Sequence, residues 1–224
     1  MMHSPHATEP PYAKHLSRLI RPFSNFDFFF IKNVRRKAVQ ALQLSPGGKV
    51  LDLGCGSGGS FPFLINAVGA TGKVVGVDIS PQSCDNARRR VNSNGWTNVD
   101  VVEAAAHDVV LTDQYDAALM FAAPDVYASA TALDNILPSL KDRARIAFFG
   151  AKLSRGSLGW LLNPFFLFMC RKLSPATPIP DETPWALLAS RLDELEVEEL
   201  FFGSMFLACG TIRSVDQTPE GRRQ

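Results

Sequence analysis

The sequence predicts an α/β fold, in which strands and helices alternate and a mostly parallel sheet carries helices on both faces. Three observations support this. An apolar run, Val50 to Leu53, precedes a glycine-rich turn and an apolar segment, 61–68, that suits a helix. Similar apolar runs recur along the chain. The 224 residues, 46% of them hydrophobic, are enough for one domain with additions. The predicted strands are 50–53, 73–79, 99–103, 114–121, 144–149, 195–202 and 205–212, the last two forming an antiparallel hairpin around Gly203-Ser204.

The stretch KVLDLGCGSGGS is the centre of the predicted fold. Gly54, Gly56 and Gly58 permit a tight turn in which the backbone can approach a ligand closely. Gly54, Gly56 and Gly59 also satisfy the G-x-G-x-x-G pattern, so a dinucleotide site is an alternative. Asp52 would repel a pyrophosphate but would favour a ligand with an ammonium or sulfonium charge.

The segment VLDLGCGSG resembles the first motif of the class I S-adenosylmethionine-dependent methyltransferases, an acidic residue followed by G-x-G-x-G. The longer run RRKAVQALQLSPGGKVLDLGCGSG is similar to the ubiquinone/menaquinone-biosynthesis group, which is methyltransferase type 11/25-like. The resemblance implies a Rossmann-like, seven-stranded, mostly parallel sheet with an antiparallel last strand, and S-adenosyl-L-methionine as the cofactor. It also implies cofactor contacts by the residues of the first motif: Asp52, Gly54, Cys55, Gly56 and Gly58.

Further cofactor contacts are expected where the next strands end. Asp78 ends the second strand, where a carboxylate can accept hydrogen bonds from both ribose hydroxyls of an adenosine; either Asp78 or Ser80 can cap the next helix. The resemblance gives Asp78 the ribose role and places Ile79 against the adenine. Ala105 stands where the family usually has an aspartate that bonds the adenine amino group, so backbone groups near Ala105 and Ala106 are expected there instead. Phe121, at the end of the fourth strand, is also expected at the cofactor site.

The catalytic candidates are His107, Asp125 and Tyr127. His107 or Asp108 is a substitute for the missing aspartate, and His107 is also a candidate base; an exposed turn is the alternative. The fourth strand is followed by AAPD, which does not match the N/D-P-P-Y/F motif of relatives that methylate amino groups or bases. Asp125 and Tyr127 are candidate substrate contacts, and Asp125 is alternatively the N-cap of a helix over 126–140.

The chain is expected to divide into a core and several additions. Thr183 is the expected N-cap of the last helix, which begins at Pro184. The expected boundaries are 1–11 for a flexible arm, 12–46 for an N-terminal helical cap, 47–153 for the cofactor-binding core, 154–183 for an apolar substrate cap inserted before the last two strands, 184–212 for the C-terminal part of the core and 213–224 for a tail.

Two segments are rich in both aromatic and basic residues. Residues 1–49 hold eight Lys/Arg against two acidic residues, and residues 152–180 hold four Lys/Arg and no acidic residue. These segments suit a hydrophobic or amphipathic substrate, peripheral contact with a membrane, or packing against the core. The expected substrate-binding residues are Tyr12, Phe26, Phe30, Trp160 and Phe165.

Composition excludes some classes of protein. A formal net charge of +1 argues against a strongly basic nucleic-acid binder, so no nucleic-acid partner is expected. No apolar run reaches the roughly 18 to 20 residues that span a bilayer. The cysteines show no metal-ligand spacing and no signal-peptide pattern is evident, which predicts reduced thiols in a cytoplasmic protein without a metal. They are Cys55, Cys84, Cys170 and Cys209.

The prediction is an S-adenosylmethionine-dependent methyltransferase that acts on a quinone precursor, a lipid or a specialised metabolite. In-line SN2 transfer needs a nucleophile held about 3 Å from the methyl group and the exclusion of water. One alternative is a non-catalytic, cofactor-binding or membrane-associated relative, which Ala105 and the AAPD segment motivate. Another is a nicotinamide-dependent oxidoreductase, which Asp52 disfavours.

Overall fold

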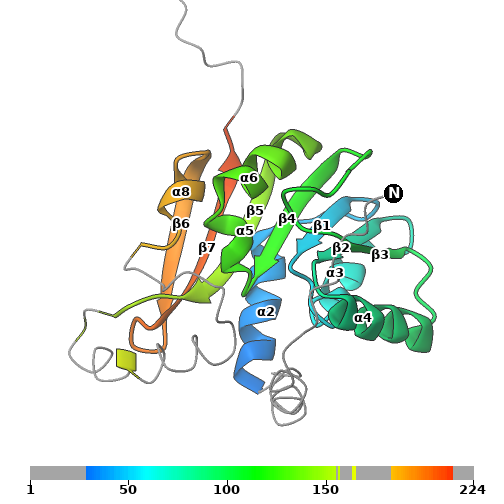
Figure 1. Cartoon of the computed structure of the whole chain (residues 1–224), viewed down its shortest axis with the longest axis horizontal. Helices are drawn as coiled ribbons and strands as arrows, with labels where there is room; N and C mark the ends of the chain where they lie inside the picture. The colour runs from blue at the N-terminus through cyan, green and yellow to red at the C-terminus, as the bar shows by residue number, and fades with distance from the viewer. Residues whose placement is uncertain (1–28, 155, 157–162, 165–182, 214–224) are drawn as a thin grey trace, which may run out of the picture.

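The computed structural model describes residues 29–154, 156, 163–164 and 183–213. They form the predicted α/β fold, with seven strands in one sheet (Figure 1). The strands are β1 (Lys49–Leu53), β2 (Lys73–Asp78), β3 (Val99–Glu103), β4 (Tyr115–Phe121), β5 (Leu140–Ala151), β6 (Leu192–Leu200) and β7 (Met205–Ile212). The helices are α2 (Phe29–Ala41), α3 (Phe61–Val68), α4 (Pro81–Asn94), α5 (Pro124–Tyr127), α6 (Ala130–Ile136) and α8 (Ala186–Ala189), with a 3₁₀ turn, η1 (Leu137–Ser139).

The sheet has the strand order β3-β2-β1-β4-β5-β7-β6. Within the group β1 to β5, every pair of neighbouring strands is parallel. Strand β7 is antiparallel to both β5 and β6, so the predicted hairpin is confirmed. The strand order reverses between β1 and β4, and open α/β sheets bind ligands at such a point, beyond the carboxyl ends of the strands.

Helices cover both faces of the sheet (Figure 1). Helices α2, α3 and α4 pack on one face of the sheet and form an apolar core with strand residues such as Val50, Ala117 and Leu119. Helices α5, α6 and α8 enclose a second core on the opposite face. Because side chains alternate along a strand, Asp52 points to the same face as Val50, toward α2 and α3.

The predicted helix over 126–140 is divided in the structure. Helix α5 ends at Tyr127, and Ser129 caps α6 by accepting a hydrogen bond from the N–H of Ala132 at 3.3 Å. Asp125 is therefore not an N-cap, because it lies within the first turn of α5. Ser129, two residues after α5, provides the cap for which Asp125 was one candidate.

Three other element boundaries also differ from the predictions. Strand β5 begins at Leu140, whereas 144 was the predicted start, and Arg143 within it has φ 56°. Strand β6 begins at Leu192, and its register shifts before Glu196, where Glu194 has φ 53°. Thr183 does not cap α8, because the N-cap position is Trp185.

Candidate functional site

The glycine-rich turn lies beyond the carboxyl ends of β1 and β2. The N–H groups of Gly54 and Cys55 both donate to the carbonyl of Val77, at 2.8 and 3.0 Å, which ties the turn to β2. Gly54 has φ 69° and Gly56 has φ 55°, in the left-handed region that favours glycine. A Cβ at Gly56 would meet nothing within 4 Å. The backbone of the turn therefore faces open space that a ligand can occupy.

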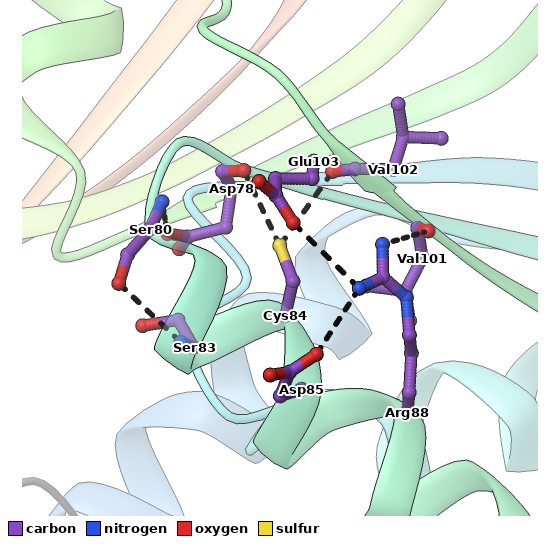
Figure 2. A network of polar contacts seen from close by, with 9 residues as sticks. All are labelled: Asp78, Ser80, Ser83, Cys84, Asp85, Arg88, Val101, Val102 and Glu103. Carbon is purple, nitrogen blue, oxygen red and sulfur yellow. Dashed lines mark hydrogen bonds and ion pairs between the residues drawn. The ribbon is translucent and has the colours of Figure 1, made fainter. Parts of the chain in front are cut away.

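Asp78 connects this turn to helix α4, and Figure 2 shows its contact with Ser80 at the start of that helix. Its Oδ2 accepts a hydrogen bond from the N–H of Gly56 at 2.8 Å, and its Oδ1 accepts one from the N–H of Ser80 at 2.9 Å. Ser80, rather than Asp78, caps α4, by accepting from the N–H of Ser83. Each carboxylate oxygen has a second lone pair. The half-buried Asp78 can therefore accept further hydrogen bonds from the hydroxyls of a ligand.

Asp52 is a buried acid beneath the turn, with an exposed fraction of 0%. Neither of its carboxylate oxygens accepts a well-aligned hydrogen bond from the residues that the structure describes. Burial raises the pKa of Asp52 to about 7, although the charge of Arg35 and the nearby Ser60 hydroxyl oppose this rise. The Ser60 hydroxyl is thus close enough to influence the pKa, while its geometry falls short of a normal hydrogen bond. A buried carboxylate without a partner is costly, and a cationic ligand would offset that cost.

Asp52→Asn is expected to stabilise the protein at alkaline pH. The folded protein holds a proton on Asp52 up to a pKa of about 7, whereas the unfolded chain releases it near 3.8. The stability that comes from this proton is complete below about pH 4 and is lost as the pH rises through 7. Urea unfolding should therefore give the variant a free energy of unfolding roughly 2–4 kcal/mol above wild type at about pH 8, and an equal one at about pH 4.

The control for this variant is Asp85→Asn, because Asp85 is an exposed carboxylate on α4. It should leave the pH dependence of unfolding as it is in wild type. A wild-type-like pH profile for Asp52→Asn would contradict the assigned state of Asp52.

Arg35 on α2 also belongs to this site, which the sequence analysis missed. Its Nη1 donates to the Ser60 Oγ at 2.9 Å, and its guanidinium carbon lies 4.2 Å from the centroid of the Phe121 ring. The sequence contains a signal for this position. Arg35 follows Ile31 by four residues and precedes Ala38 by three, so helical periodicity places it on the same buried face as both.

The residues expected around the adenine lie along the same edge of the sheet. Ile79 is 63% exposed although it is large and hydrophobic, and it directly follows Asp78. Ala105 and Ala106 are half-buried in the turn after β3. Their carbonyl groups already accept hydrogen bonds, from the N–H of Asp108 at 3.0 Å and from the Asn135 amide at 3.0 Å respectively. An exposed apolar side chain beside Asp78 suits a flat aromatic ring.

The three catalytic candidates have different surroundings. His107 is exposed and pairs with Asp108, Nε2 to Oδ2 at 3.3 Å, in the turn after β3. Asp125 is exposed in α5, and partial desolvation and the charge of Asp78 raise its pKa. Tyr127 is a core residue with an exposed fraction of 1%, and its ring lies 5.6 Å from that of Phe148. Tyr127 thus lies in the packed core, whereas the sequence analysis considered it a substrate contact.

Of the expected substrate-binding residues, the structure describes Phe30. Its half-buried ring lies against the ring of Phe201, with 3.6 Å between centroids. Phe201 and Phe202, in the turn between β6 and β7, are 37% and 66% exposed, and the sequence analysis did not single them out. The other expected substrate-binding residues lie outside the described residues: Tyr12, Phe26, Trp160 and Phe165.

The described part of the chain places limits on two other kinds of site. It contains no group of three or more His, Cys, Asp or Glu side chains arranged to hold a metal ion. None of its helices is long and apolar enough to cross a membrane. Cys55, Cys84 and Cys209 are free and buried, and burial raises the pKa of the Cys55 thiol. The role of Cys55 in the turn is therefore that of its backbone.

The fold and the site together define a class I S-adenosylmethionine-dependent methyltransferase domain. The strand order, the glycine turn after β1 and the acid at the end of β2 all fit this class. A family model described as a methyltransferase domain matches residues 50–143, from β1 into β5. The family resemblance that VLDLGCGSG indicates is confirmed.

Known proteins resemble parts of the chain in sequence or share its fold. The 2-phytyl-1,4-naphtoquinone methyltransferase of Nostoc sp. is 39% identical over 88 residues, which are 38% of this chain and 38% of that protein. An uncharacterised 37.1 kDa protein in transposon TN4556 of Streptomyces fradiae is 30% identical over 122 residues, 54% of this chain and 33% of that protein. The chain thus spans between 33% and 38% of the length of these two relatives. The crystal structure of a SAM dependent methyltransferase from Aquifex aeolicus shares the fold, with a TM-score of 0.61 and 23% identity over 92% of this chain and 100% of that one.

Proposed function

We propose that this protein is an S-adenosylmethionine-dependent methyltransferase that acts on a small hydrophobic or amphipathic acceptor. The observation that carries the proposal is the position of two carboxylates around one open glycine turn. Asp78 is aligned on the turn by the N–H of Gly56, and Asp52 lies buried beneath the turn without a well-aligned partner among the described residues. A pyrophosphate would be repelled by both, whereas a ligand with a ribose and a cationic amino-acid group would be favoured.

The residues of the site fit this cofactor. Asp78 would accept hydrogen bonds from the ribose hydroxyls, Ile79 would pack on the adenine, and the backbone at Gly56 would lie along the amino-acid part. Asp52 would supply negative charge near the ammonium group. When bound, S-adenosylmethionine supplies a methyl group on a cationic sulfur, so that a nucleophilic atom of the acceptor can form a bond to the methyl carbon as the carbon–sulfur bond breaks. The protein's own contribution is to position the acceptor in line and to exclude water.

The aromatic residues near the end of β5 support an apolar acceptor. Met205, directly after the β6–β7 turn, pairs with Ala151, so this turn lies at the carboxyl end of β5. Phe201 and Phe202 have φ of 49° and 56°, a backbone conformation that costs a bulky residue about 1–2 kcal/mol. The Ser154 hydroxyl helps to hold this turn by donating to the carbonyl of Phe202 at 2.8 Å. Strain of this kind is often retained where a turn serves a binding site.

The name of the Nostoc relative suggests the first acceptor to examine. That protein is named as a methyltransferase of a naphthoquinone that carries a long apolar chain. A hydroquinone has a nucleophilic ring and hydroxyl groups, and its apolar chain would suit the aromatic surface of Phe30, Phe201 and Phe202. We therefore propose a prenylated hydroquinone or a chemically similar lipid as the acceptor.

Two measurements on the full chain test this function. Calorimetry should show binding of S-adenosylhomocysteine, and label should pass from methyl-tritiated S-adenosylmethionine to a prenylated naphthohydroquinone faster than to the same ring without its chain. Binding with no transfer to a panel of hydroquinones, phenols and phospholipids would favour the non-catalytic alternative. A folded protein that binds no S-adenosylhomocysteine would exclude the proposed function.

A further inference from the structure

We propose that Arg35 is a positioning residue of the methyl-donor site. Arg35 holds α2 against the glycine turn, and it supports the negative charge on Asp52 that a cationic donor requires. The inference rests on the proposed function and adds to it. It assigns part of the donor site to α2, a helix that precedes the residues matched by the methyltransferase family. It also makes donor binding depend on the protonation of a buried acid.

The geometry fixes Arg35 between three parts of the site. The side chain comes from α2, its Nη1 bonds the Ser60 hydroxyl at 2.9 Å, and its guanidinium lies over the ring of Phe121 at the end of β4. A Cβ at Gly59 would lie 3.0–3.1 Å from the guanidinium atoms. The glycine turn therefore has the shape needed to receive this arginine, since most side chains at Gly59 would displace it.

The charges around Asp52 explain what Arg35 does there. Arg35 on α2 is the cation that lowers the pKa of Asp52, and the Asp78 carboxylate at the end of β2 raises it. Among the residues that the structure describes, the Cys55 thiol in the turn also lies close to Asp52, and its pKa is raised, so it stays neutral. Arg35 thus counteracts the rise in the pKa of Asp52 that burial and Asp78 cause, and it keeps Asp52 able to ionise near neutral pH.

A linkage between donor binding and protons follows. The ammonium of a bound donor stabilises ionised Asp52, so the complex holds this proton less tightly than the free protein does. Binding then releases protons at and below about pH 7, and the affinity should rise by up to about tenfold per pH unit until it levels off above 7. Without the positive charge of Arg35, the same rise in donor affinity should occur at higher pH.

The test is calorimetry of S-adenosylhomocysteine binding to the full chain, from about pH 5.5 to 8.5, in pairs of buffers with different ionisation enthalpies. Arg35→Gln should bind about tenfold more weakly at pH 7, and its affinity profile should shift by about one pH unit upward. Arg35→Lys should restore part of the shift because it restores the charge. Arg36→Gln is the matched control, since Arg36 is the exposed neighbour of Arg35 on α2, and it should match wild type. Asp52→Asn should remove the proton release, and thermal unfolding should verify that each variant is folded.

Each outcome decides between the claims. Proton release that disappears in Asp52→Asn and shifts in Arg35→Gln supports the inference. A wild-type pH profile in folded Asp52→Asn, or equal profiles for Arg35→Gln and Arg36→Gln, would overturn the role of Arg35 while leaving the proposed function intact. If folded wild-type protein does not bind S-adenosylhomocysteine at any pH, the proposed function fails and this inference fails with it.

Discussion

Asp78→Ala is expected to weaken S-adenosylhomocysteine binding by at least about a hundredfold. The carboxylate accepts hydrogen bonds from the N–H groups of Gly56 and Ser80, and we propose that it also accepts them from the ribose. A hydrogen bond to a charged group contributes roughly 1.5–3 kcal/mol, so the loss of two ribose contacts alone accounts for this factor. The glycine turn also loses the acceptor that aligns Gly56, which should reduce affinity further. Calorimetry on the purified full chain measures the effect.

Asp85→Ala provides the control for this prediction. Asp85 lies on α4, directly after Cys84, and its carboxylate pairs with Arg88 at 3.4 Å (Figure 2). Arg88 also pairs with Glu103 at 3.7 Å, so the end of β3 should stay in place when Asp85 is removed. We expect nearly wild-type affinity for Asp85→Ala. An affinity of Asp78→Ala equal to that of this control would refute the ribose assignment.

Local sequence patterns were sufficient to predict the parts of the site that follow one another along the chain. The run VLDLGCGSG predicts β1 and its turn, and the next apolar run places Asp78 at the end of β2. Both predictions were possible because the strand, turn and helix signals there are contiguous. The seven-stranded, mostly parallel sheet with an antiparallel last strand followed from the resemblance to a known family and is confirmed. These features need no knowledge of which residues meet across the sheet.

Contacts between distant segments were not predictable in the same way. Arg35 and Ser60 are 25 residues apart, and only the packing of α2 on the sheet brings them together. Tyr127 follows a strand end, which made it a candidate substrate contact, but its ring packs in the core against those of Phe148 and Phe206, far along the chain. The strained conformation of Phe201 and Phe202 was also not evident, since phenylalanine rarely adopts positive φ.

Gly54→Ala is expected to destabilise the protein and to abolish donor binding, through a contact that joins the glycine turn to the end of β4. A Cβ at Gly54 would lie 2.6 Å from the Cβ of Ala123, and Ala123 is almost fully buried. Alanine at φ 69° costs about 1–2 kcal/mol, and overpacking adds about 1–3 kcal/mol. Urea unfolding should therefore show a loss of roughly 2–5 kcal/mol. Movement of the turn away from Ala123 should lower the affinity for S-adenosylhomocysteine by more than about tenfold, since the ligand lies along the same backbone.

Gly95→Ala separates the two causes of this effect. Gly95, after α4, has φ 64° and ψ 28° in the left-handed region, but a Cβ there would meet nothing within 4 Å, so this variant carries the conformational cost without the clash. It should lose only about 1–2 kcal/mol and bind S-adenosylhomocysteine as wild type does. Combining Gly54→Ala with Ala123→Gly removes the facing methyl group and should recover much of the additional loss, together with part of the binding. Equal stability of Gly54→Ala and Gly95→Ala would show that the close approach of Gly54 to Ala123 does not constrain the turn.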